Sequence, residues 1–166
     1  VTDAQGNVVP NVTVNFTADN GAGVATSSAT TDNQGLASTN LTNVKAGTTK
    51  VTAAVNGHSQ TVDTTFIADD STATIVSGDL TVTVNNAKAN GTDSNKVQAK
   101  VTDATGNPVP NTAVSFTADN GATVVTASVT TDDQGLASTT LTNVNFDPDR
   151  IRSQINAAHR EKARLA

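Results

Sequence analysis

The sequence predicts an all-β protein that consists of two tandem β-sandwich modules, both truncated, followed by a short C-terminal α-helix. Three observations predict this class: an internal repeat, hydrophobic alternation with a period of two residues, and turn signals between the alternating runs. Residues 1–44 return at 101–144 with 33 of 44 positions identical and no gap. A constant offset of 100 residues indicates tandem copies of one module rather than a single compact enzyme.

The strands are predicted by residues that alternate between apolar and polar along the chain. In the first copy Val14, Phe16 and Ala18 alternate with Thr and Asn, and the second copy repeats the pattern at 114–118. Such alternation is typical of half-buried strands. The same pattern recurs at 37–41, 51–55, 62–66, 80–84 and 97–101. Short strands at this spacing favour a Greek-key β-sandwich.

Turn signals separate these runs and repeat with them. Each combines an Asp or Asn that can bond its own backbone with a glycine that tolerates positive φ. They stand at 3–7, 19–21 and 32–35 and again at 103–107, 119–121 and 132–135. Prolines at Pro10, Pro108 and Pro110 stand where a strand begins and no ladder N–H is needed. Residues 68–74 are predicted to be a short junction that keeps the modules close together.

The two copies are incomplete at opposite ends. After Val44 the first copy continues with further strand-like runs, whereas after Val144 the second continues with an unrelated sequence. We therefore assign 1–68 to a module that lacks its first strands, 69–146 to a module that lacks its last strands, and 147–166 to a helical tail of unclear origin. The chain is interpreted as a window on a longer protein. Open sheet edges also predict edge-to-edge self-association, which light scattering tests.

Composition limits the functional classes. The net charge is −5, and the first 146 residues carry five lysines and no arginine against twelve aspartates. A surface without clustered cations argues against a nucleic-acid partner, because such binding depends on the release of counterions. The absence of cysteine from the sequence excludes disulfides, thiolate metal sites and a cysteine nucleophile. Only four phenylalanines are present, so each core is predicted to consist mainly of small aliphatic side chains.

The last twenty residues have a different character from the repeats. Asp147 is a predicted helix cap, Pro148 fits the first helical position, and Ile151, Ile155 and Leu165 recur at helical spacing. We expect a helix from about 148 to 164, either solvated or packed on the sandwich edge.

Neither catalysis nor a strong metal site is predicted. The two histidines, His58 and His159, fall in different predicted structural classes, so a His-based metal cage or a Ser-His-Asp triad lacks the necessary groups. His58 is predicted to follow a two-residue hairpin turn at Asn56-Gly57. Loop aspartates are the remaining candidates, because calcium prefers carboxylate oxygens. The calcium hypothesis names Asp69, Asp70 and Asp132, and the alternative for each is turn capping.

Three motifs occur in order in both copies, the first with one departure: VTDA-x-GNPVPN, V-x-FTADNGA and TTD-x-x-GLAST-x-LTN. Together with the 100-residue period, they resemble the bacterial Ig-like repeats, group one, of the intimin and invasin family. The resemblance covers residues 1–144 and departs where Val8 replaces the first proline of the Pro-x-Pro pair. It implies an Ig-like fold in an inverse-autotransporter adhesin, with an outer-membrane barrel elsewhere in the parent protein and a receptor-binding domain at its far tip.

Two functional hypotheses follow. The first is a structural stalk on the bacterial cell surface that spaces and presents a distal binding domain, with neighbouring Ig-like modules of the same chain as partners. The second is that the modules themselves bind carbohydrate, matrix or neighbouring cells. The host or bacterial ligand is not identified by the sequence, and no cofactor besides the calcium hypothesis is expected. An enzyme is not expected, because no nucleophile, base and orienting group can be assembled.

Overall fold

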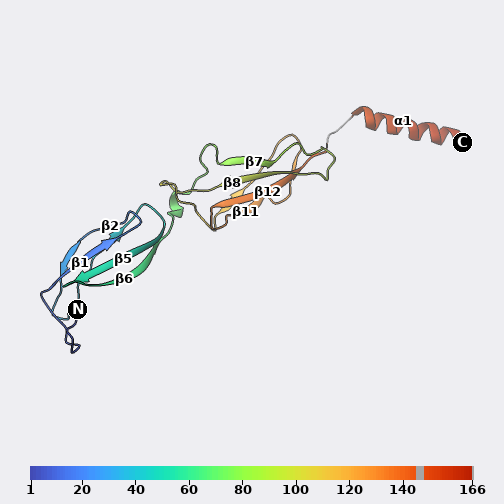
Figure 1. Cartoon of the computed structure of the whole chain (residues 1–166). Helices are drawn as coiled ribbons and strands as arrows, with labels where there is room; N and C mark the ends of the chain where they lie inside the picture. Colours follow the sequence, from blue (N-terminus) through green and yellow to red (C-terminus); the bar gives the residue numbers. More distant parts are fainter. Residues whose placement is uncertain (145–147, 166) are drawn as a thin grey trace.

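The computed structural model describes residues 1–144 and 148–165 and shows two β-sandwich modules arranged end to end (Figure 1). A single 3₁₀ turn, η1 (Asp70–Thr72), lies between the modules, and an α-helix, α1 (Pro148–Leu165), lies at the C-terminal end. All strand pairs are antiparallel. The predicted tandem all-β class with a short terminal helix is confirmed.

The first module has a four-stranded sheet of order β3-β1-β5-β6 that faces a two-stranded sheet of order β2-β4. Its strands are β1 (Thr13–Ala18), β2 (Gly23–Val24), β3 (Ser28–Thr30), β4 (Leu41–Thr42), β5 (Gly47–Val55) and β6 (His58–Phe66). The predicted hairpin is present, because Val55 pairs with His58 across a turn of Asn56 and Gly57. Both turn residues have positive φ, 49° and 77°, as a two-residue hairpin turn requires.

The second module distributes its strands differently. A four-stranded sheet of order β10-β12-β8-β7 faces a two-stranded sheet of order β11-β9. Its strands are β7 (Leu80–Val84), β8 (Asn95–Lys100), β9 (Ala113–Ser115), β10 (Thr123–Val124), β11 (Ser128–Thr130) and β12 (Leu136–Thr142). By the 100-residue offset, β9 to β12 correspond to β1 to β4, so each module contains strands that the other lacks.

Equivalent strands differ in length because their pairing partners differ. β12 has seven residues and pairs along its length with β8, whereas β4, its counterpart, has only two and pairs with β2 alone. β1 has six residues and pairs with β5, whereas β9 has three and pairs only with β11. The predicted strand at 37–41 is thus mostly non-ladder backbone. A strand persists only where a neighbour accepts its hydrogen bonds.

The core is deeper in the second module. Its buried cluster consists of Ala99, Val101, Val109, Val114, Phe116 and Ala137. In the first module only Val14 and Val51 are buried apolar side chains among the described residues. The difference arises because β8 covers the core of the second module, where it supplies Ala99 and continues into Val101. The first module has no counterpart of β8 within the described residues. Ala68 and Ala73, which flank η1, also pack against the core of the second module.

The tail forms the predicted helix, but its described side chains contact neither sheet edge. Every side chain described from Arg152 to Leu165 is exposed, including Ile155 and Leu165. An exposed ion pair joins Glu161 to Arg164 at 2.8 Å, a type of contact that adds little stability. The predicted cap at Asp147 and the side chain of Ile151 lie outside what is described. Within the described residues, no helix combines the length and apolar character needed to span a membrane.

Candidate functional site: the junction between the modules

A five-residue loop of the second module, Asp103–Asn107, faces the first module. It follows the buried Val101 and reverses the chain, with Gly106 at φ +88°. The Asp103 N–H donates to the Asn107 carbonyl at 2.9 Å, and the Gly106 N–H donates to the Asp103 carbonyl at 3.1 Å. The sequence forms this turn because Asp can accept from N–H groups two and four residues ahead while glycine takes the left-handed position. We call this loop the docking loop.

The Asp103 carboxylate is the centre of the docking loop, and only 4% of the residue's surface is exposed. Its Oδ1 accepts from the N–H groups of Thr105 and Asn107, at 3.0 and 2.8 Å, and from the Thr105 hydroxyl at 3.1 Å. Its Oδ2 accepts from the Asn107 amide at 2.9 Å and from the Asp69 N–H at 3.0 Å. Among the described residues no cation pairs with it, so these five hydrogen bonds compensate the burial of its charge.

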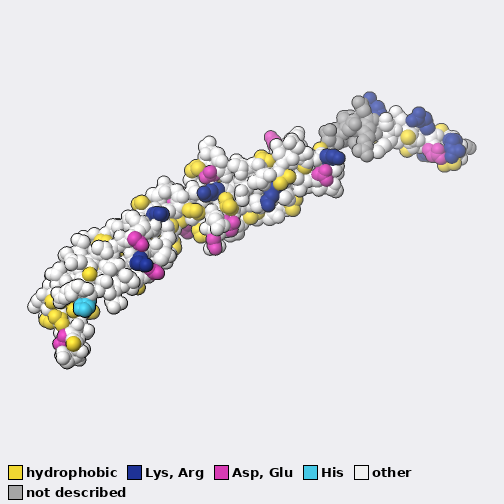
Figure 2. All heavy atoms as spheres, in the orientation of Figure 1, with side chains coloured by type: hydrophobic (Ala, Val, Ile, Leu, Met, Phe, Trp, Pro, Cys, Tyr) yellow, Lys and Arg dark blue, Asp and Glu magenta, His cyan; other side chains and the backbone are white. Residues whose placement is uncertain are grey.

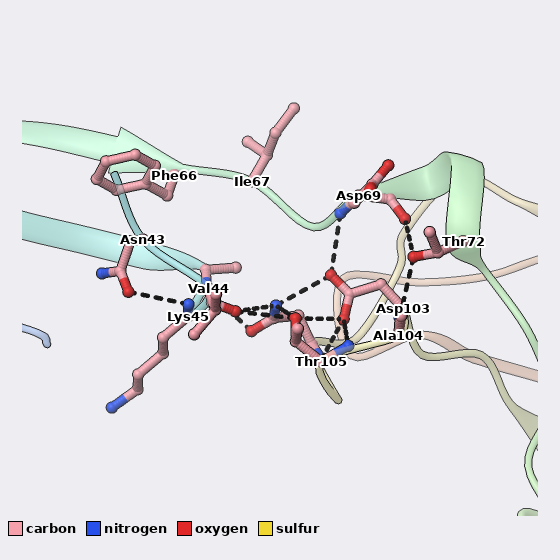
Figure 3. A pocket seen from close by; sticks show the side chains of 12 residues that line it. Asn43, Val44, Lys45, Phe66, Ile67, Asp69, Thr72, Asp103, Ala104 and Thr105 are labelled. Carbon is pink, nitrogen blue, oxygen red and sulfur yellow. Dashed lines mark hydrogen bonds between the residues drawn. The ribbon is translucent and has the colours of Figure 1, made fainter. Parts of the chain in front are cut away.

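Asn107 connects the docking loop to the first module. Figure 3 shows Thr105 of the same loop next to Val44 of the first module. Its side-chain Nδ2 donates to the Val44 carbonyl at 2.8 Å, and its Oδ1 accepts from the Ala46 N–H at 2.9 Å. The Thr105 hydroxyl lies 2.9 Å from the Val44 carbonyl, so its single proton is shared between this carbonyl and Asp103. Because the amide presents a donor and an acceptor in one plane, it matches a carbonyl and an N–H of the loop that precedes β5.

The linker between the modules is held on the same side. Asp69 caps η1 by accepting from the Ser71 N–H while its own N–H donates to Asp103. The Thr72 hydroxyl accepts from the Ala104 N–H at 2.9 Å. Thr74 then exchanges two backbone hydrogen bonds with Thr102, at 2.8 and 2.9 Å. The linker is therefore bonded to the second module at Asp69, Thr72 and Thr74, and few backbone torsions remain free at the junction.

Electrostatics favours the ionised form of Asp103. Hydrogen bonds, of which that from the Asn107 side chain is the largest, hold the pKa of the Asp103 carboxyl well below its ordinary value of 3.8, and burial only partly opposes them. The carboxylate is therefore charged at any physiological pH, and the junction depends on a charged acceptor at its centre.

Acid is expected to weaken the second module and its junction through this group. Because the folded-state pKa is lowered, its stabilisation is complete above pH 3.8 and declines as the pH falls further. Thermal unfolding followed between pH 5 and pH 2 checks this, with Asp103→Asn as the comparison. The variant is expected to lose stability less steeply in acid than the original chain. Equal slopes for both chains would contradict the assignment.

Within the described residues, the structure does not bring the three residues of the calcium hypothesis together as a group. Asp69 and Asp70 lie in the linker, where Asp69 accepts from Ser71, and Asp132 accepts from the N–H groups of Gln134 and Leu136 in its own turn. A hollow at the junction is lined by Asp70 and Asp133 but not by Asp132. In the described ranges, no three acidic or histidine side chains converge. The hypothesis stays a prediction, and these contacts are those of turn capping.

Comparison with known proteins places the two modules in a family. The sequence model of the bacterial Ig-like domain, group 1, matches residues 1–67 and 77–165. The chain belongs to this family. The resemblance that its motifs indicate is thereby confirmed, and the second match extends through the helical tail to residue 165.

Individual relatives of these Ig-like modules are adhesins. The inverse autotransporter adhesin YeeJ of Escherichia coli K12 is 40% identical over 150 residues, which cover 86% of this chain but 6% of that protein. The solved structure of FdeC, an Escherichia coli adhesin, shares the fold with a TM-score of 0.59 at 24% identity, over 86% of this chain and 47% of that one. The D0-D1 domain of intimin is 27% identical with a TM-score of 0.40, over 87% of this chain and 74% of that one. The similarity to YeeJ, of which this chain covers 6%, is a similarity to a small part of an adhesin.

Proposed function

We propose that the two Ig-like modules are a stalk segment of a bacterial surface adhesin that holds a distal binding domain away from the cell. The observation that carries the proposal is the junction, where Asp103 and Asn107 fix one module end to end on the next. Repetition of such a unit supplies length and stiffness. In this proposal the parent protein is anchored in the outer membrane through a part outside this chain.

The shape and surface of the segment agree with a spacer. The two modules form an elongated body rather than a globule (Figure 1). On the face shown in Figure 2, charged side chains are few and scattered among neutral polar atoms, without a concentrated patch of one sign over the modules. A surface of this kind gives solubility without a strong electrostatic attraction to a particular partner.

A second candidate function, binding by the modules themselves, is favoured by one observation. β7 exposes three apolar side chains along its length, Leu80 at 60%, Val82 at 57% and Val84 at 49%. An apolar strip at a sheet edge is the kind of surface that contacts a partner. A binder of this type has to lose its activity when the strip is changed.

Repeat number separates the two functions. Cells are made to display one, two or three 100-residue units of this sequence beneath a nanobody of known antigen, and capture of antigen-coated beads is counted. The stalk proposal predicts that capture rises with the number of units and that Leu80→Ser, at an exposed side chain, leaves it unchanged.

Adhesion of the same cells to uncoated surfaces and to neighbouring cells is measured in parallel, without the nanobody. Adhesion that is already complete with one unit and is abolished by Leu80→Ser would contradict the stalk proposal and support binding by the modules. Thr81→Ser, on the same strand and also exposed, is the matched control that leaves Leu80, Val82 and Val84 unchanged.

A further inference from the structure

The first module carries a second version of the docking loop at Asp3–Asn7. Its internal hydrogen bonds reproduce those of Asp103–Asn107. Oδ1 of Asp3 accepts from the N–H groups of Gln5 and Asn7, at 3.0 and 2.9 Å, and Oδ2 accepts from the Asn7 amide at 3.1 Å. The backbone bonds also match, with Gly6 at φ +84° and its N–H on the Asp3 carbonyl at 3.1 Å. The loop is therefore already folded in the conformation that the junction uses.

The two loops differ in what surrounds them. In the second module Oδ2 of Asp103 also accepts from Asp69, and the Asn107 amide engages Val44 and Ala46. In the first module Asp3 and Asn7 are exposed, and within the described residues their hydrogen bonds stay inside the loop. The loop lies at the end of the first module away from the junction (Figure 1).

We propose that Asp3–Asn7 is a docking surface for a preceding Ig-like module of the same type. The inference rests on the stalk proposal, because it extends the array by one junction. The partner has to present a carbonyl and an N–H two residues apart in the loop before its β5, as Val44 and Ala46 do. It also has to present a linker N–H at the position of Asp69.

The groups that are present and free favour this partner over the second module of another copy of the chain. After Asn143-Val144 the described structure continues with α1 from Pro148 instead of a strand like β5. In a second copy of the chain the groups of Val44, Ala46 and Asp69 are already bonded to that copy's own Asn107 and Asp103. One contact changes in the new junction, because Gln5 stands where Thr105 donates its hydroxyl to Val44. The Asn and Asp contacts are retained.

The repeat makes a direct test possible, because residues 1–100 can be fused directly to the N-terminus of the full chain at Val1, without a linker. Lys100 then precedes Val-Thr-Asp-Ala as it does at Val101. The extended chain contains two junctions, one formed by Asn107 and one by Asn7. The addition also gives the module that begins at Val1 its counterparts of β7 and β8.

The extended chain contains Ala46 twice, once in the added unit and once in the original chain. Hydrogen exchange at Ala46 reports each junction separately when the added unit and the original chain are isotopically labelled in turn. We expect the Ala46 amide to be protected in both the added unit and the original module. Asn7→Ala in the original chain is expected to accelerate the exchange of Ala46 about tenfold in the added unit only, which corresponds to the loss of about 1.4 kcal/mol with the hydrogen bond that protects this amide. Asn107→Ala is expected to do the same in the original module only. The amide of Val51, which pairs with Val62 across the β5–β6 ladder, is the control for folding and should remain protected in every variant.

The outcomes separate this inference from the function on which it rests. If Asn107→Ala accelerates exchange at its junction but Asn7→Ala leaves the added unit unchanged, the docking surface is overturned and the stalk proposal stands. If Ala46 is unprotected at both junctions, both are overturned. Selective acceleration by each variant at its own junction supports both.

Discussion

Asn107→Ala is expected to release the first module from the second while both modules stay folded. The substitution removes the amide that bonds Val44, Ala46 and Asp103 and leaves their polar groups to water or unpaired. Only the bonds to Val44 and Ala46 cross the junction, and their loss corresponds to about 2 kcal/mol of docking free energy. The undocked state is therefore expected to become more populated.

Nitrogen-15 relaxation measures the release. In the original chain the two modules are expected to share one rotational diffusion tensor, and in Asn107→Ala the correlation times of the two modules are expected to separate and shorten. Asn7→Ala is the matched control, because Asn7 occupies the same loop position at the outer end of the first module. A control that loosens the modules as much as Asn107→Ala would contradict the assignment.

Gly135→Ala is expected to destabilise the second module strongly, by about 3–5 kcal/mol, from backbone strain and steric overlap together. Gly135 has φ +75°, and a methyl group there would lie 2.5 Å from the Val101 carbonyl oxygen and 3.1 Å from the Val109 nitrogen. Both are backbone atoms beside the core, so neither can move without shifting buried Val101 and Val109. The free energy of unfolding from urea titration measures the effect.

Gly121→Ala separates the effect of backbone strain from the effect of steric overlap. Gly121 has a similar φ of +73°, but the nearest atom to an added methyl is 4.0 Å away. This variant is expected to lose only the conformational part, about 1 kcal/mol. Equal losses at the two glycines would show that the contact with Val101 and Val109 is unimportant.

Local patterns predict the parts of this fold that depend on local chemistry. The β5–β6 hairpin follows from alternating residues on either side of Asn56-Gly57, and α1 follows from helical spacing after Pro148. The lengths of β4 and β9 do not follow, because the same sequence pattern forms a long strand or a short one according to the neighbour available. Pairing of this kind is decided by tertiary context.

The local sequence pattern also does not predict that the docking loop contacts the first module. Asp103 and Asp3 stand in nearly the same five-residue motif, and sequence reasoning assigns both to turns, which is what each loop forms within itself. Only the structure shows that Asn107 reaches residues more than sixty positions earlier in the chain. The signal available in the sequence is the repetition of the motif at a module boundary, where a turn alone does not require both Asp and Asn.

The stalk proposal requires the docking loop to hold the two modules in one fixed arrangement. Spin labels at Thr61 on β6 and Thr81 on β7, both exposed in a chain without native cysteine, report the distribution of distances between the modules. One narrow distribution is expected for the original chain and a broad one for Asn107→Ala. A distribution that is equally broad in both chains would contradict a fixed junction and, with it, the stalk proposal.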